Sequence, residues 1–142
     1  MSEALAQAQI EDIVETFDLL GDWEARYQYL VELGERLPAM DTADQADANR
    51  VKECMSLVHV AAHPVGDGRI RYSGDCDTAI IKGVVALLVE LFSDKTPVEI
   101  EDLDVDELFT GLHLDEHLSP NRHVGVYAIV GKMKAQAAAY AP

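Results

Sequence analysis

The chain has 142 residues, of which 49% are hydrophobic and 26% charged, and its formal net charge at pH 7 is -15. This composition is typical of a folded globular protein, and such a negative charge argues against nucleic acid as a partner because phosphates are repelled. No apolar run approaches the ~20 residues of a membrane-spanning helix. The opening sequence MSEALAQAQ lacks the basic and apolar regions of a signal peptide, so we expect a cytoplasmic protein.

The length predicts a single domain over residues 1–142, in which residues 1–9 form a disordered N-terminus. Charge is unevenly distributed along this domain. Residues 50–82 contain five basic and four acidic side chains, a net charge of +1, whereas the rest of the chain carries -16. Both cysteines, Cys54 and Cys76, lie in this charge-balanced stretch. Two cysteines without a Cys-x-x-Cys pair predict neither a disulfide framework nor a structural zinc site.

Two antiparallel helices are predicted at the start of the chain. Apolar residues recur at helical spacing from Ile10 to Phe17. Gly21 followed by Asp22 is typical of one helix ending and the next beginning. The second helix should end before Pro38, and the polar, Ala- and Asp-rich sequence that follows is predicted as a loop.

A β-hairpin is predicted in the middle of the chain. Residues 55–63 are rich in valine and other apolar side chains, which indicates a strand covered on both faces. Residues 64–68 have turn chemistry, and residues 69–73 alternate between polar and apolar, which indicates a half-exposed strand. The two strands should therefore pair as a hairpin.

Helices are predicted after the hairpin. Residues 74–77 should turn into a helix that buries an apolar stripe from Ile80 to Leu91. Thr96 opens a capping box with proline at the first helical position, and residues 119–120 open the last helix. The fold class predicted from these elements is α+β, a small antiparallel β-sheet covered by helices.

Cys54 is the residue that most clearly suggests a chemical role. It lies where a polar loop meets an apolar strand, and Arg50 and Lys52 precede it closely. A nearby cation favours the thiolate, which is the species that attacks sulfur, whereas Glu53 acts in the opposite direction. The alternative is that Cys54 is a buried, unreactive core residue, as free cysteines commonly are. The residues alone leave both interpretations open.

Four motifs occur in order along the chain. They are Trp-Glu-x-Arg-Tyr with Leu-Gly-x-x-Leu-Pro at 23–38, Val-x-x-Cys-x-Ser-x-Val at 51–58, Gly-Asp-x-Asp with Ala-Ile-Ile-Lys-Gly at 74–83, and Leu-Ser-Pro-x-Arg-x-x-Gly at 118–125. Together they resemble the SufE/CsdE family of sulfur acceptors over residues 10–140. The resemblance implies a SufE/IscU-like fold, with a third strand that the sequence does not place.

The resemblance also implies a function. In that family the cysteine of the second motif takes persulfide sulfur from a cysteine desulfurase and passes it on for Fe–S cluster assembly. Cys54 is therefore expected to accept sulfur from a SufS/CsdA-type desulfurase, which the chain stimulates, and to deliver it to a SufBCD-type Fe–S scaffold. The chain is then not itself an enzyme and has no cofactor of its own, because pyridoxal phosphate belongs to the desulfurase.

Five charged residues are expected to contact the desulfurase: Arg122, Asp77, Arg50, Lys52 and Lys82. Arg122 matches the arginine of the last motif, and the first turn of a helix is an unfavourable place for a cation, which suggests a role outside the helix. The basic residues between 50 and 82 lie in the charge-balanced stretch. Capping the following helix is a simpler role for either Asp75 or Asp77.

Three positions depart from the family pattern. Glu53 replaces the usual glycine before the cysteine, His59 replaces an aromatic residue, and Cys76 replaces the serine of a Gly-Asp-Ser-Asp turn. Cys76 is either a near-isosteric replacement or a second, resolving thiol. His113 and His117 are four residues apart, but no recognisable motif completes a metal site there, so none is predicted.

Two other functions remain open on the sequence. A thiol hydrolase or peroxidase using Cys54 would need a base within hydrogen-bond reach and an oxyanion site. His59 is a poor base, because a regular strand would point it to the face opposite Cys54. The third function is a regulatory adaptor that binds a desulfurase without accepting sulfur.

Overall fold

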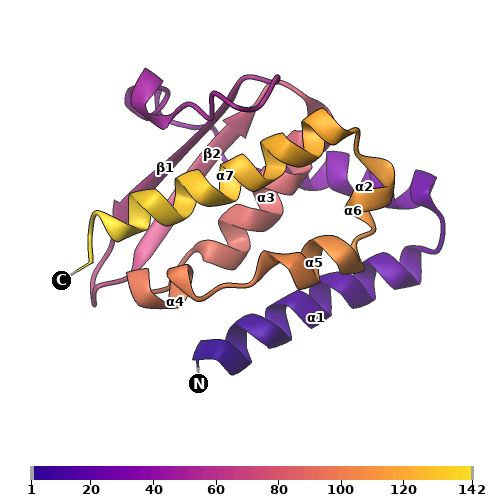
Figure 1. The fold of residues 1–142 in the computed structure, drawn as a ribbon, viewed down its shortest axis with the longest axis horizontal. Helices are drawn as coiled ribbons and strands as arrows, with labels where there is room; N and C mark the ends of the chain where they lie inside the picture. The colour runs from indigo at the N-terminus through magenta and orange to yellow at the C-terminus, as the bar shows by residue number, and fades with distance from the viewer. Residues whose placement is uncertain (1, 142) are drawn as a thin grey trace.

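The computed structural model describes residues 2–141 and shows a β-hairpin covered by helices (Figure 1). Helix α3 packs on strand β2, and α7 packs on β1. The predicted α+β class, with a small antiparallel sheet covered by helices, is confirmed. The elements are α1 (Ser2–Leu20), α2 (Trp23–Glu35), the 3-10 helices η1 (Thr42–Asp44) and η2 (Asp47–Asn49), β1 (Val58–Pro64), β2 (Ile70–Cys76), α3 (Ala79–Phe92), α4 (Pro97–Glu101), α5 (Val105–Gly111), α6 (Leu114–His117) and α7 (Pro120–Ala138).

The N-terminal helix is longer than the sequence indicated. Residues 1–9 were expected to be disordered, but α1 begins at Ser2, so that expectation is wrong for all of them except Met1, which lies outside the described residues. Contacts distant in sequence hold this first part of the helix. The Gln9 amide oxygen accepts a hydrogen bond of 2.7 Å from the buried amine of Lys95. Helix α1 then ends at Leu20, and the next residue, Gly21, has a positive φ of 85° that suits glycine.

The hairpin pairs its strands antiparallel, with Val58 opposite Cys76 and His59 opposite Asp75. Strand β1 begins at Val58 rather than at Met55, because the residues before it form a loop. Strand β2 continues to Cys76 rather than ending at residue 73, because β1 offers backbone partners as far as Val58. Cys76 therefore lies at the end of a strand and not in a turn.

The sheet has two strands within residues 2–141, so the third strand implied by the family resemblance is not formed there. Single antiparallel bridges extend the hairpin instead. Arg50 bridges His59 beside β1, and Lys95 bridges Ile70 beside β2. The Ile70 amide donates to the Lys95 carbonyl oxygen at 2.8 Å. These bridges partly cover both edges of a sheet too small to stand alone.

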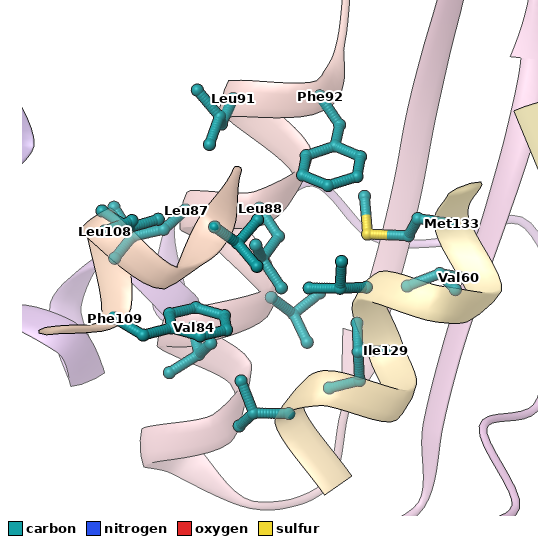
Figure 2. Close-up of a cluster of buried hydrophobic side chains, with 14 of the residues drawn as sticks. Val60, Val84, Leu87, Leu88, Leu91, Phe92, Leu108, Phe109, Ile129 and Met133 are labelled. Carbon is teal, nitrogen blue, oxygen red and sulfur yellow. The ribbon is translucent and has the colours of Figure 1, made fainter. Parts of the chain in front are cut away.

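The hydrophobic core lies between α3, α5, α7 and the hairpin (Figure 2). The predicted stripe of α3 from Ile80 to Leu91 is buried, which confirms it. The largest group of labelled side chains in Figure 2 comes from α3 and meets side chains of α5, α7 and β1: Val84, Leu87, Leu88, Leu91, Phe92, Leu108, Phe109, Ile129, Met133 and Val60.

None of the helices within residues 2–141 combines the length and apolar character needed to cross a bilayer.

Helices α2 and α3 approach so closely that only glycine fits between them. A Cβ atom added at Gly83 would lie 2.1 Å from the carbonyl oxygen of Leu30, and one added at Gly34 would lie 3.0 Å from the Gly83 amide nitrogen. Both contacts are with backbone atoms, which cannot turn aside as a flexible side chain can. Glycine at these two motif positions therefore sets the distance between the helices.

Gly83→Ala should destabilise the protein strongly, by about 3 kcal/mol or more, because its methyl group would overlap the Leu30 carbonyl. Gly131→Ala is the matched control on α7. Nothing lies within 4 Å of a Cβ atom there, so helix propensity should stabilise the protein by up to about 1 kcal/mol. Urea unfolding measures both changes. Equal stability of Gly83→Ala and the parent protein would show that the helices can separate at little cost.

Candidate functional site

The loop that carries Cys54 is fastened at both ends. At its base, the Val51 amide donates to the Val58 carbonyl oxygen at 2.9 Å, and the Cys54 amide donates to the Val51 carbonyl oxygen at 3.3 Å. Near its end, the Leu57 amide donates to the Asp77 carboxylate at 2.9 Å, while the Asp77 amide donates to the Leu57 carbonyl oxygen at 3.2 Å. Residues 52–56 therefore form a short loop between two hydrogen-bonded anchors.

The thiol of Cys54 is shielded, with 6% of the residue exposed. Helix α7 covers it at Gly125, where an added Cβ atom would lie 2.9 Å from the Cys54 sulfur. The neighbouring Met55 is 83% exposed and points into solvent. The loop thus keeps its sulfur inside and presents an apolar side chain outside, at the same turn.

Cys54 lies at a surface hollow of about 340 Å³ that is built from three separate segments. They are the cysteine loop, the start of α3 and the start of α7. The residues lining this hollow, called the cysteine hollow below, are Cys54, Met55, Ser56, Asp77, Thr78, Ser119, Asn121 and Arg122. Three of the predicted site residues, Cys54, Asp77 and Arg122, are therefore brought together.

Arg122 occupies the first turn of α7 and is exposed. Its backbone amide donates to the Ser119 hydroxyl oxygen at 3.3 Å, so Ser119 caps the helix. The Arg122 guanidinium forms no ion pair with the side chains that the structure describes. Its cationic end is available to a partner at the mouth of the cysteine hollow.

Arg50 and Lys52 lie outside the cysteine hollow. They line a second hollow of about 440 Å³ together with Glu53 and with Lys132 of α7. The Lys52 amine also forms an exposed ion pair with Asp47 at 3.3 Å. This second hollow adjoins the same loop, because Glu53, which lines it, is next to Cys54 in the chain.

Lys82 lines neither hollow. Its amine pairs with the Asp75 carboxylate at 3.2 Å. The expectation that Asp75 or Asp77 caps α3 is wrong, because the N-cap is Thr78 and its side chain makes no capping hydrogen bond. The Asp77 carboxylate instead accepts a hydrogen bond from the Leu57 amide, so it fastens the cysteine loop and does not cap α3.

Cys76 is buried at the end of β2 and is absent from the lining of the cysteine hollow. Its sulfur accepts a hydrogen bond from the Thr78 amide at 3.4 Å. Burial raises the pKa of the Cys76 thiol to about 11, an effect that the hydrogen bond from the Thr78 amide opposes and the nearby Asp77 and Asp75 carboxylates reinforce. Cys76 is therefore a neutral thiol near pH 7, which makes it a weak nucleophile.

The histidines considered as bases or ligands do not line the cysteine hollow. His59 is in β1 opposite Asp75 and does not line the cysteine hollow, which contains a single carboxylate and no imidazole among its described residues. His113 contacts Glu116 at 3.0 Å, and His117 stacks on Trp23 with ring centroids 3.8 Å apart. Among the side chains that the structure describes, no three His, Cys, Asp or Glu residues are grouped as a metal site would require.

Sequence reasoning missed several residues of the site. Thr78 and Asn121 line the cysteine hollow, and Ser56 and Thr78 share a hydrogen bond of 2.5 Å between their hydroxyl groups. Ser56, Thr78 and Asn121 lie within the second, third and fourth motifs, so the motifs could have pointed to them as site residues. Lys132 had no such signal, because it reaches the second hollow only through the packing of α7 beside the loop.

Two comparisons with known proteins bear on this site. The SufE family model, described as "Fe-S metabolism associated domain", matches residues 11–137. A solution structure of a hypothetical protein from Thermus thermophilus is similar, with a TM-score of 0.76 and 23% sequence identity. The match covers 93% of this chain and 95% of that chain. At this identity the second likeness supports the fold alone.

Gly125→Ala should uncover Cys54, because its methyl group would lie 2.9 Å from the sulfur and displace the loop. We expect alkylation of Cys54 by iodoacetamide to accelerate, by roughly tenfold, since reaction requires an accessible thiolate. The measurement uses a Cys76→Ser background so that one thiol is followed. Gly131→Ala, on the same helix but without close contacts, should leave the rate unchanged. Equal rates for both variants would mean that Gly125 does not hold the loop closed.

Proposed function

The chain belongs to the SufE family, and from this premise we propose that Cys54 accepts persulfide sulfur from a SufS/CsdA-type cysteine desulfurase and passes it to a SufBCD-type Fe–S scaffold. The family ties the chain to Fe–S metabolism. The observation that carries the finer proposal is the position of Cys54, a buried thiol on a short loop beside a hollow that also holds Arg122.

The transfer is a thiol–persulfide exchange. The Cys54 thiolate attacks the outer sulfur of the desulfurase persulfide, a new bond forms between the Cys54 sulfur and that atom, and the sulfur–sulfur bond of the donor breaks. The donor cysteine leaves as a thiolate and takes up a proton. One persulfide is consumed and one is formed, so no net oxidant or reductant is required. Pyridoxal phosphate remains on the desulfurase, and the chain contributes the Cys54 sulfur atom as the acceptor of the transferred sulfur.

Transfer requires the loop to open. At 6% exposure the Cys54 sulfur cannot reach a partner sulfur, so residues 52–56 have to move away from Gly125 when the partner docks. The anchors at Val58 and at Asp77 confine this movement to a few residues. Between encounters the closed loop protects the bound sulfur, since a buried persulfide meets few soluble thiols.

The charges around the loop favour docking there. The surface must approach closely for two sulfur atoms to react, and a face as acidic as the rest of the chain would be costly to desolvate. The linings of the two hollows together hold four basic and three acidic side chains, and the guanidinium of Arg122 is exposed at the mouth of the cysteine hollow. A guanidinium binds a partner carboxylate through two hydrogen bonds, which a lysine cannot copy.

Sulfur should be found on Cys54 after incubation with a desulfurase and cysteine. Intact-mass and peptide mass spectrometry should show one added sulfur atom in the peptide containing Cys54, and Cys54→Ser should abolish it. Cys76→Ser should retain transfer near the parent rate, because burial keeps that thiol protonated. Sulfur on Cys76 alone would contradict the assignment. Full stimulation of the desulfurase by Cys54→Ala would favour the regulatory adaptor instead.

Arg122→Ala should weaken stimulation of the desulfurase, because it removes the cation at the mouth of the cysteine hollow. We expect the half-saturating concentration to rise about tenfold and Arg122→Lys to restore part of the loss. Arg36→Ala, which removes an exposed arginine that lines neither hollow, is the matched control. Circular dichroism checks folding. Unchanged half-saturation of folded Arg122→Ala would remove Arg122 from the interface.

A further inference from the structure

A second surface feature lies between α1 and α5, which run side by side (Figure 1). It is a groove of about 570 Å³, called the α1–α5 groove below. Its accessible apolar part is formed by the half-buried Val14 of α1 and Gly111 of α5, and the buried Ile10 lies at its base. Glycine is needed there, because an added Cβ atom at Gly111 would lie 2.5 Å from a methyl group of Val14. The two helices touch at this point, and the groove follows their line of contact.

Carboxylates surround the apolar part of the groove. Five of its nine lining residues are acidic and none is basic: Glu11, Glu15, Asp18, Asp106 and Glu107. This charge density differs from that of the second hollow beside Cys54, whose lining includes Arg50, Lys52 and Lys132. An apolar surface edged on both helices by negative charge selects for a ligand that is apolar in the middle and cationic on its flanks.

The carboxylates are poorly neutralised within the chain. Asp18 reaches the Arg26 guanidinium at 4.0 Å, and this is the one ion pair that the structure describes for any of the five. Glu107 accepts a hydrogen bond of 2.6 Å from the Gln7 amide, and Asp106 accepts one of 2.6 Å from the Tyr127 hydroxyl. Neutral donors leave the negative charges in place, so a cationic partner gains from them.

We propose that the α1–α5 groove binds a basic amphipathic helix of a partner protein, with an apolar ridge on Val14 and Gly111 and with lysine or arginine side chains over the carboxylates. A helix suits the site because its ridge of side chains packs into the groove between two others. Nucleic acid does not suit it, because phosphates would be repelled.

This site is separate from the sulfur-transfer face. The α1–α5 groove shares no lining residue with the cysteine hollow or with the second hollow beside the loop. A partner in the groove therefore needs none of the residues proposed to meet the desulfurase. The inference goes beyond sulfur acceptance, and its test is independent of Cys54.

The test uses a synthetic probe on the full chain. The probe is an amidated peptide of about 14 residues, or four helical turns, with leucine at helical spacing and lysine elsewhere. Backbone amide NMR shifts at physiological salt should change for residues 10–18 and 106–111. A second peptide, in which serine replaces every leucine, keeps the charge and should not produce these shifts, because it has no apolar ridge.

Charge-reversal variants separate local recognition from net charge. Glu11→Lys with Glu15→Lys should weaken binding of the leucine–lysine peptide about tenfold or more, measured by fluorescence anisotropy. Glu32→Lys with Glu35→Lys makes the same change in net charge on exposed positions of α2, outside the groove, and should alter the affinity less than twofold. Circular dichroism confirms that both variants fold.

Three results would overturn the inference. If both pairs of substitutions weakened peptide binding equally, the peptide would be responding only to the overall negative charge of the protein. Equal binding of the serine peptide would show that the apolar part of the groove is not used. Shift changes away from α1 and α5 would place the peptide elsewhere on the surface.

Discussion

The packing of α7 across the hairpin is the interaction on which the rest of this structure depends. A two-stranded hairpin is at best marginally stable in water, and here helices supply the missing cover. The Tyr72 hydroxyl donates to the Met133 carbonyl oxygen at 2.6 Å, and the Gln136 amide donates to the Val60 carbonyl oxygen at 2.7 Å. These bonds tie the C-terminal half of α7 to both strands, so the direction of the helix is set by the sheet.

The same helix also completes the candidate site. Once its C-terminal half lies on the hairpin, its N-terminal half reaches the loop before β1, where Gly125 contacts Cys54 and Arg122 joins the lining of the cysteine hollow. Stability and site geometry therefore have one structural origin. A change in the register of α7 would disturb the core around Ile129 and the cover of the thiol together.

The two cysteines illustrate how position decides the chemistry of one side chain. Both are buried to the same extent, at 6% exposure. Cys76 is held in a paired strand, where its neighbours cannot withdraw without breaking the sheet, and burial keeps it a neutral thiol. Cys54 is on a loop of a few residues between hydrogen-bonded anchors, and a glycine is its cover. Only the loop position of Cys54 allows a sulfur atom to be buried in the free protein and then exposed to a partner.

The sequence by itself determined the elements whose signals are local. Asp22 caps α2, Thr96 and Glu99 form the predicted capping box, and the apolar stripe of α3 is buried as its spacing indicated. Such features depend on residues within one or two helical turns of each other, so a short stretch of sequence is enough to predict them. The four motifs likewise pointed to the SufE family, which the match over residues 11–137 confirms.

The tertiary structure decided what depends on residues far apart in the chain. Ser2–Gln9 is helical although its sequence suggested disorder, with Lys95 bonded to Gln9 across 86 positions. Asp77 binds the cysteine loop rather than capping α3, and Arg122 shares a hollow with Cys54 while Lys82 does not. Local propensity carries no information about these contacts, because each forms only when separate elements pack on a common core.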